Sequence, residues 1–195
     1  MLIPDYVEGT FQMSTPSRAD AVRNRQLALD AATALLAEPD AALTVEAIAK
    51  KAGLGAGTVV RAFGGKEALL DAAVAGLLRP VVARARDLAA DDRPDRALRT
   101  FLGELMTFQA AHHAAGDNLR GLAAPETTAL RGELVAAVET MLTGAQRAGR
   151  VRADIPLGTL TAVIGEAAYA VARSGAADHI DAFLTVLLDG LKPST

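Results

Sequence analysis

The chain contains no cysteine and no tryptophan, and aromatic residues make up only 4% of its 195 residues. Without cysteine, a disulfide framework, a thiolate nucleophile and a cysteine-based zinc site are all excluded. β-Strands favour aromatic and β-branched side chains, whereas alanine, which is abundant here, is the strongest helix former. The composition therefore favours an all-α fold, and the length suits one compact domain or two small units.

The sequence also lacks an apolar run of the roughly 18 residues that a membrane-spanning helix needs. Its first residues, MLIPDYVEGTFQM, have neither the basic nor the apolar segment of a signal peptide. We therefore expect a cytoplasmic protein without a membrane partner. Residues 1–17 show no helical periodicity and include Pro4 and Pro16, which predicts a flexible N-terminal arm.

Positive charge is scarce overall but gathers in one segment. The net charge of −3 argues against a general affinity for nucleic acids. Between Arg18 and Lys66, however, seven basic residues outnumber five acidic ones, a local excess of +2. A solvated helix face can produce so small an excess, but this segment also contains the most specific motif of the chain.

That motif, residues 44–66, has the sequence TVEAIAKKAGLGAGTVVRAFGGK and predicts two short helices joined by a tight turn. Thr44 is a candidate N-cap of the first helix, and Gly53 suits the left-handed residue that ends it. A second helix is expected over 56–63, where Gly64-Gly65 stops it. This arrangement is a helix-turn-helix, whose second helix can enter the major groove of DNA.

The motif resembles the DNA-binding segment of TetR-type bacterial transcriptional repressors. That family follows the pattern Ile-Ala-x-x-Ala-Gly-Val-Ser-x-Gly-Thr-Leu-Tyr-x-His-Phe-x-x-Lys-Glu-x-Leu. The matching positions are Ile48, Ala49, Ala52, Gly53, Gly57, Thr58, Phe63, Lys66, Glu67 and Leu69. The resemblance covers about residues 18–70. It implies a three-helix N-terminal head over 18–66 and a helical bundle over 67–195 for ligand binding and dimerisation.

Three positions depart from the family pattern. Gly55 stands where the family usually has a capping serine, Val60 replaces an aromatic residue, and Ala62 replaces histidine or a similar polar residue. The changes at 60 and 62 remove hydrogen-bonding groups that often face phosphates or base edges. The guanidinium of Arg61 can compensate by gripping phosphate or guanine. The alternative is an all-helical ligand-binding or scaffold protein whose head no longer reads DNA.

The resemblance implies a homodimeric, ligand-responsive repressor that binds near-palindromic double-stranded DNA. Thr44 and Lys66 are expected to hold phosphates, and Arg18 and Arg25 of the first helix can also reach them. The residues expected to face the groove are Gly55, Ala56, Gly57, Thr58 and Arg61.

Apolar residues at helical spacing predict about nine helices in all. Outside the motif we expect them over about 18–37, 66–90, 95–115, 118–123, 125–148, 157–173 and 178–191. Val22, Leu29 and Leu36 define the expected buried face of the first helix. The last helix has a broad apolar face that needs more than one neighbour. The resemblance implies that the last two helices pack against those of a second subunit; a role in one subunit's core alone is the alternative.

A small-molecule effector is expected in the C-terminal bundle, because ligand sites between helices are largely apolar with few polar groups. The candidate lining residues are Phe101, Leu105, Met106, Phe108, His112, Met141 and Tyr169. Each of them is also an ordinary candidate for the core, and the sequence does not identify the ligand.

No set of residues predicts catalysis or a bound cofactor. The hydroxyl residues lack the His/Asp context of a triad, and Gly53, Gly55 and Gly57 match a dinucleotide-binding loop only in part. Glu104 and His112 lie two helical turns apart, so a shared metal is geometrically conceivable, but a ligand-lining or surface histidine is the preferred interpretation. We expect no enzyme activity, no metal and no cofactor.

Overall fold

The computed structural model describes residues 17–38, 41–118, 124–174 and 179–193. In these ranges the chain forms eight α-helices and no strand, which confirms the all-α prediction. The helices are α1 (Arg18–Leu36), α2 (Val45–Ala52), α3 (Ala56–Phe63), α4 (Lys66–Ala89), α5 (Pro94–Asn118), α6 (Pro125–Arg147), α7 (Leu157–Arg173) and α8 (Ile180–Gly190). The expected arm 1–17, apart from Ser17, and the expected short helix 118–123, apart from Asn118, lie outside the described residues.

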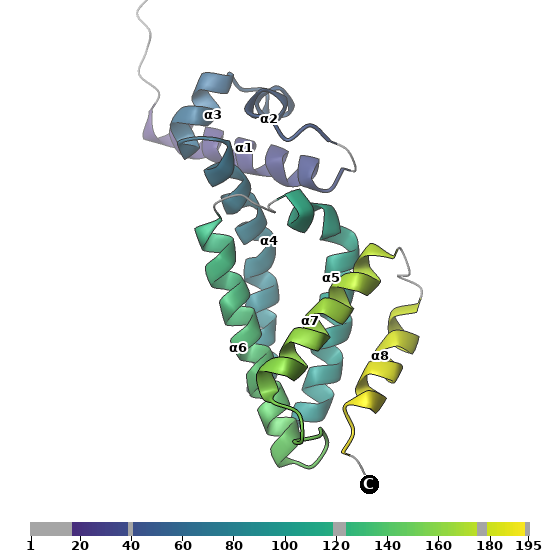
Figure 1. Cartoon of the computed structure of the whole chain (residues 1–195). Helices are drawn as coiled ribbons and strands as arrows, with labels where there is room; N and C mark the ends of the chain where they lie inside the picture. The colour runs from purple at the N-terminus through teal and green to yellow at the C-terminus, as the bar shows by residue number, and fades with distance from the viewer. Residues whose placement is uncertain (1–16, 39–40, 119–123, 175–178, 194–195) are drawn as a thin grey trace, which may run out of the picture.

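Helices α1, α2 and α3 form a head at one end of the molecule (Figure 1). Thr44 caps α2 as predicted, because its hydroxyl oxygen accepts a hydrogen bond from the N–H of Ala47 at 3.1 Å. Gly53 ends α2 with φ of 67°, and Gly64 ends α3 with φ of 83°, conformations that a side chain disfavours. These local signals place α3 at the bounds that the sequence predicted.

The buried face of α1 begins later than the sequence predicted. Ala32 and Leu36 are fully buried, but Val22, expected on the same face, is 65% exposed. No residue between 18 and 27 is buried, because the hydrophobic core of the head begins at Ala28. The prediction for Val22 was therefore wrong, since helical spacing alone does not show where a neighbouring helix ends.

The long helix α4 leaves the head and runs down the bundle beside α6 (Figure 1). In its first half Leu70 and Val74 are buried in the same core as residues of α1, α2 and α3, which we call the head core. In its second half Ala85 and Leu88 belong to a separate cluster with residues of α5 to α8, which we call the bundle core. One continuous helix, uninterrupted at Pro80, thus takes part in both cores.

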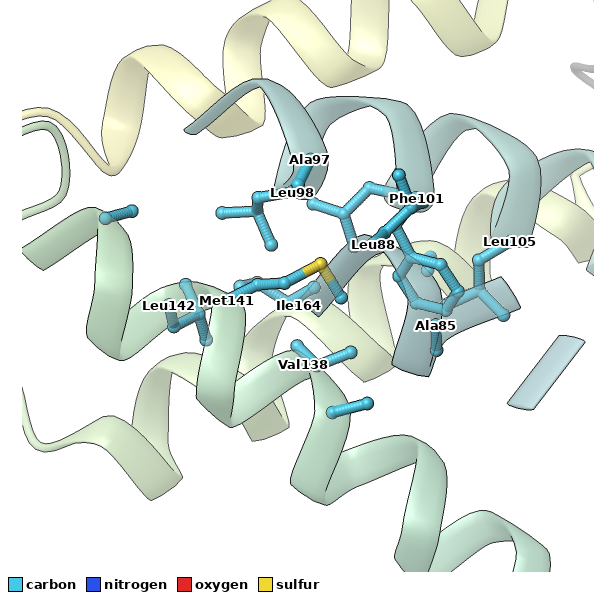
Figure 2. Packing of buried hydrophobic residues seen from close by; sticks show 14 of the residues in the cluster. Ala85, Leu88, Ala97, Leu98, Phe101, Leu105, Val138, Met141, Leu142 and Ile164 are labelled. Atoms are coloured by element: carbon cyan, nitrogen blue, oxygen red, sulfur yellow. The ribbon is translucent and has the colours of Figure 1, made fainter. Parts of the chain in front are cut away.

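The bundle core fills the space between the C-terminal helices. Figure 2 shows Phe101 of α5 and Met141 of α6 within one cluster, together with Ile164 of α7. Helix α8 completes this core through Leu184. Among the helices that the structure describes, none combines the length and the apolar character needed to cross a bilayer.

Helix α5 is kinked at His112, whose φ of −131° and ψ of 18° are not helical. The imidazole Nδ1 of His112 donates a hydrogen bond to the carbonyl oxygen of Phe108 at 2.9 Å. The two rings also stack, with 4.6 Å between their centroids. A side chain that inserts into the backbone hydrogen-bond ladder is a known cause of a sharp kink. Beyond the kink the helix continues to Asn118, three residues past the predicted end.

A buried carboxylate on α4 caps the start of α6. The side chain of Asp71 accepts hydrogen bonds from the backbone N–H groups of Glu126 at 3.0 Å and Thr127 at 2.8 Å. Ala124, which precedes α6, has no side chain that can cap it, so these first-turn donors find their partner on α4. Burial raises the pKa of the Asp71 carboxyl, but the hydrogen bonds from Thr127 and Glu126 outweigh it, and the net pKa lies below its ordinary value.

We predict that Asp71→Asn lowers the free energy of unfolding by about 2 kcal/mol at pH 7, because hydrogen bonds to a charged acceptor are lost. For a chain of this length the midpoint of thermal unfolding should fall by roughly 4–8 °C. Since folding depresses this pKa, the stabilisation is present above the unfolded carboxyl's pKa of about 4 and is lost as the pH falls through the folded value.

Thermal unfolding followed by circular dichroism at pH 7 and in acid measures this difference. The matched control is Asp87→Asn, which changes an exposed carboxylate on the same helix. Equal stability of wild type and Asp71→Asn at pH 7, or a difference that persists unchanged in acid, would contradict the assigned role.

Candidate functional site

The outer face of α3 carries the residues that can meet another molecule. Val59 is 1% exposed and anchors the inner face of α3 in the head core, whereas Gly57, Val60 and Arg61 are exposed. Gly55, the N-cap of α3, makes no side-chain hydrogen bond to the first turn. The beginning of α3 therefore presents backbone N–H groups and small residues, which allow close approach to a ligand backbone.

The Arg61 side chain folds back along α3 over its first turn. Its Nη2 donates a hydrogen bond to the hydroxyl oxygen of Thr58 at 3.3 Å. A Cβ atom at Gly57 would lie 3.5 Å from Arg61 Nη1, at ordinary van der Waals contact, so the guanidinium lies over this glycine. Because the Thr58 oxygen accepts from Arg61, its own hydrogen remains to donate to an acceptor such as a base edge or a phosphate.

Arg25 of α1 fixes the other end of α3. Its Nη1 donates a hydrogen bond to the carbonyl oxygen of Ala62 at 2.5 Å, and its guanidinium lies 4.0 Å from the centroid of the Phe63 ring. The sequence predicts that Arg25 can reach a phosphate, which stays a prediction; in the structure Arg25 also holds α3 against α1. This role was missed because it depends on how two helices cross.

The other residues predicted to contact DNA lie at helix starts around α3. Thr44 begins α2, Lys66 is exposed at the first position of α4, and Ala56 is half-buried against the head core. The structure thus brings residues 55–58 together at the start of α3, whereas Thr44 and Lys66 lie at the starts of α2 and α4. Their contacts with DNA stay predictions.

A cavity of about 470 Å³ lies between α4, α5, α6 and α7. Most of its wall is apolar, and Leu105, Phe108, His112 and Tyr169, four of the predicted ligand residues, line it. Phe101 instead lines a smaller hollow of about 290 Å³ together with Leu105 and Phe108. Met106 and Met141, 0% and 1% exposed, lie in the bundle core and line neither cavity.

Besides Tyr169, four residues with polar side chains line the larger cavity: Gln109, His112, Arg131 and Glu166. The Oε1 atom of Gln109 is buried and has no hydrogen-bond partner among the described residues. Because a carbonyl oxygen only accepts, the bond to Phe108 places the hydrogen of His112 on Nδ1, which leaves Nε2 an acceptor in the neutral ring. The cavity therefore offers His112 Nε2 as an acceptor to a ligand that carries a hydrogen-bond donor, whereas Gln109 Oε1 is buried beneath the wall.

The cavity lies where the two cores meet. Val74, Leu78 and Ala115 line it and also belong to the head core, while Leu105 lines it from the bundle core. A molecule in this cavity would therefore contact residues that hold the head in place.

Sequence patterns missed Gln109, Arg131 and Glu166, because polar residues at these spacings are usual on exposed helix faces. Glu104, considered with His112 for a shared metal, is held by both Nε and Nη2 of Arg84, each at 2.9 Å. The hydrogen bonds from Arg84 lower the pKa of the Glu104 carboxyl.

Two family models and several solved structures are similar to this chain. A family model described as bacterial regulatory proteins of the tetR family matches residues 28–73. A second model, the C-terminal domain of SbtR-like transcriptional regulators, matches residues 93–193. No curated protein matches the chain.

Among solved structures, the chain is similar to a TetR transcription regulatory protein from Mycobacterium vanbaalenii, with 32% identity, a TM-score of 0.60, and coverage of 90% of this chain and 98% of that one. It is also similar to the TetR transcriptional regulator SCO0520 from Streptomyces coelicolor, with 28% identity, a TM-score of 0.62 and coverage of 88% and 99%. FadR from Bacillus subtilis, solved in complex with stearoyl-CoA, shares the fold at 16% identity, with a TM-score of 0.69 and coverage of 85% and 98%.

We predict that Gln109→Met raises the free energy of unfolding by about 1 kcal/mol, or roughly 2–4 °C in thermal midpoint. Methionine has a similar length and removes a buried acceptor that lacks a partner. The contrasting control is Gln146→Met, because the Gln146 amide donates to the Arg152 carbonyl oxygen at 2.9 Å and its loss should destabilise. A Gln109→Met protein less stable than wild type, measured by thermal unfolding without ligand, would contradict this description of the cavity.

Proposed function

Because the chain belongs to the TetR family of bacterial regulatory proteins, which are DNA-binding transcriptional regulators, we propose that it represses transcription from a near-palindromic operator and leaves that operator when a small molecule binds. The observation that carries this proposal is the exposed outer face of α3, with Arg61 over its first turn. We divide the chain by function into an arm (1–17), a DNA-binding unit (18–66) and a unit for ligand binding and dimerisation (67–195).

In the proposed complex, α3 enters the major groove. Arg61 releases its weak bond to Thr58 and contacts a guanine, which offers O6 and N7 to a guanidinium. Thr58 donates its hydroxyl hydrogen, and the small residues at 55–57 let the backbone approach the DNA. Thr44 and Lys66 hold phosphates on either side of the groove and fix the position of α3, without selecting a sequence themselves.

A symmetric dimer would present two such helices to the DNA, so the operator should be a near-palindrome with half-sites about one helical turn, or a multiple of it, apart. The outward faces of α7 and α8 support dimerisation through the last two helices. Val163 on α7 and Val186 on α8 are 56% and 73% exposed, and Ala162 and Ala182 are exposed beside them. A second copy of the chain would cover these exposed apolar side chains.

The effector is proposed to occupy the cavity of about 470 Å³ between α4, α5, α6 and α7. Its chemistry follows from the wall: a largely apolar molecule with a hydrogen-bond donor that meets His112 Nε2. Arg131 and Glu166 offer one charge of each sign, so the wall carries no net charge that would select an ionic ligand. The complex of Bacillus subtilis FadR with stearoyl-CoA supports a largely apolar effector for this fold.

Release from DNA follows if the ligand prefers one arrangement of the helices. A ligand shifts only an equilibrium between states that it binds with different affinity. Val74, Leu78 and Ala115 belong to the cavity wall and to the head core, which gives the ligand a direct influence on the placement of the head. We propose that the liganded dimer spaces its heads wrongly for the operator. Such a regulator acts on bacterial DNA in the cytoplasm, and we assign it no catalytic role.

We predict that Arg61→Ala weakens specific DNA binding by about tenfold or more, because a guanidinium–guanine contact contributes about 1–3 kcal/mol of discrimination. Fluorescence anisotropy with duplex from immediately upstream of the gene, in excess unrelated duplex and near-physiological salt, measures this change. The control Arg99→Ala removes an exposed arginine of α5 and should bind like wild type.

Specific binding typically exceeds non-specific binding by about a thousandfold or more, so a specific complex survives the competitor. Unchanged affinity of Arg61→Ala would remove Arg61 from the contact. A wild-type protein that shows no sequence preference on any duplex would instead favour a head that no longer reads DNA.

A further inference from the structure

Val60 is an exposed apolar residue on the face of α3 that the proposed function directs into the groove. It is 43% exposed, and among the described residues it is the one exposed large hydrophobic residue within α2 and α3. On the helix Val60 lies one turn from Gly57 and next to Arg61, so Val60 and Arg61 lie on either side of the surface left open at Gly57. No side chain at Gly57 covers it.

Stability does not explain a valine here. The inner face of α3 is already anchored by Val59, and Val60 is absent from both hydrophobic cores and from the residues packed against them. Valine is also a weaker helix former than alanine, so an alanine at this exposed position would suit α3 better. The position therefore carries apolar surface that the isolated protein does not use.

In the major groove this surface has one specific complement. Thymine alone among the four bases presents a C5 methyl group there, and apolar side chains recognise it by direct contact. Valine has no donor or acceptor, so it cannot replace the aromatic hydroxyl that the family pattern places at this position. The loss of a hydrogen-bonding group at 60 thus changes the kind of contact that α3 makes with DNA.

We propose that Val60 reads the C5 methyl group of a thymine in each half-site of the operator, beside the guanine contacted by Arg61. This inference rests on the proposed function, because it requires α3 to lie in the major groove. It adds a specificity-determining residue and a chemical requirement on the operator: each half-site contains both a thymine whose methyl group is read and a guanine.

The test exchanges single thymidines of the operator for 2′-deoxyuridine, which pairs identically but lacks the methyl group. The operator is first obtained by enrichment from random duplexes with the full-length protein. At one thymine position, uracil in one half-site should lower the affinity of the wild type about fourfold, the value for burial of one methyl-sized group. Uracil at that position in both half-sites removes two such groups and should lower the affinity about fifteenfold. The Val60→Ala protein lacks the two methyl groups that reach the thymine, so the difference between the thymine and uracil duplexes should largely disappear at that position.

Val22→Ala is the matched control, because Val22 is also an exposed valine of the head, and it should retain the full sensitivity to uracil. If Val60→Ala binds too weakly for anisotropy, enrichment from random duplexes with this variant replaces the anisotropy measurement. The preference for thymine at that one position should then disappear, while the base preferences at the other operator positions stay.

The proposal is overturned if uracil is tolerated at every thymine, or if Val60→Ala keeps the thymine preference. In both cases the wild type would still bind its enriched operator, so the proposed function would stand. If the proposed function were wrong, the first step would already show it, because the wild type would enrich no preferred duplex.

Discussion

Helix α4 is a single continuous helix buried in two hydrophobic cores, and the placement of the head relative to the bundle depends on it. Leu70 and Val74 complete the head core, and Ala85 and Leu88 enter the bundle core about three turns later. Asp71 then fixes α6 to α4 by accepting the first-turn N–H groups of α6. The head is therefore joined to the bundle by packing and by a charged cap, which a flexible linker could not provide.

This shared helix gives the cavity its importance. The cavity wall combines members of the head core with Leu105 of the bundle core, and the kinked part of α5 borders it at His112. Ala115, just beyond the kink, lies in the head core. A molecule that repositions the wall therefore acts on the packing of α1 to α3 without touching them. Arg25 holds the C-terminal end of α3, where α4 begins, against α1.

The parts of this architecture that local chemistry determines could be predicted from the sequence. Gly53 and Gly64 end their helices because only glycine adopts such φ values without strain, and Thr44 caps α2, so the helix-turn-helix was located correctly. Features that depend on how helices cross could not be predicted. Helical spacing wrongly predicts that Val22 lies in the core. It gives no signal for the Asp71 cap or for the roles of Arg25 and Gln109. It also does not show which of the predicted ligand residues line the cavity and which lie in the core.

We propose above that α3 reads DNA as one of a symmetric pair. Enrichment of binding sites from a pool of random duplexes by the full-length protein tests it most directly, because it requires no knowledge of the natural operator. We expect an inverted repeat whose two half-sites are one helical turn or a multiple of it apart. A pool that shows no enriched sequence after repeated selection, or only a single unrepeated site, would contradict it.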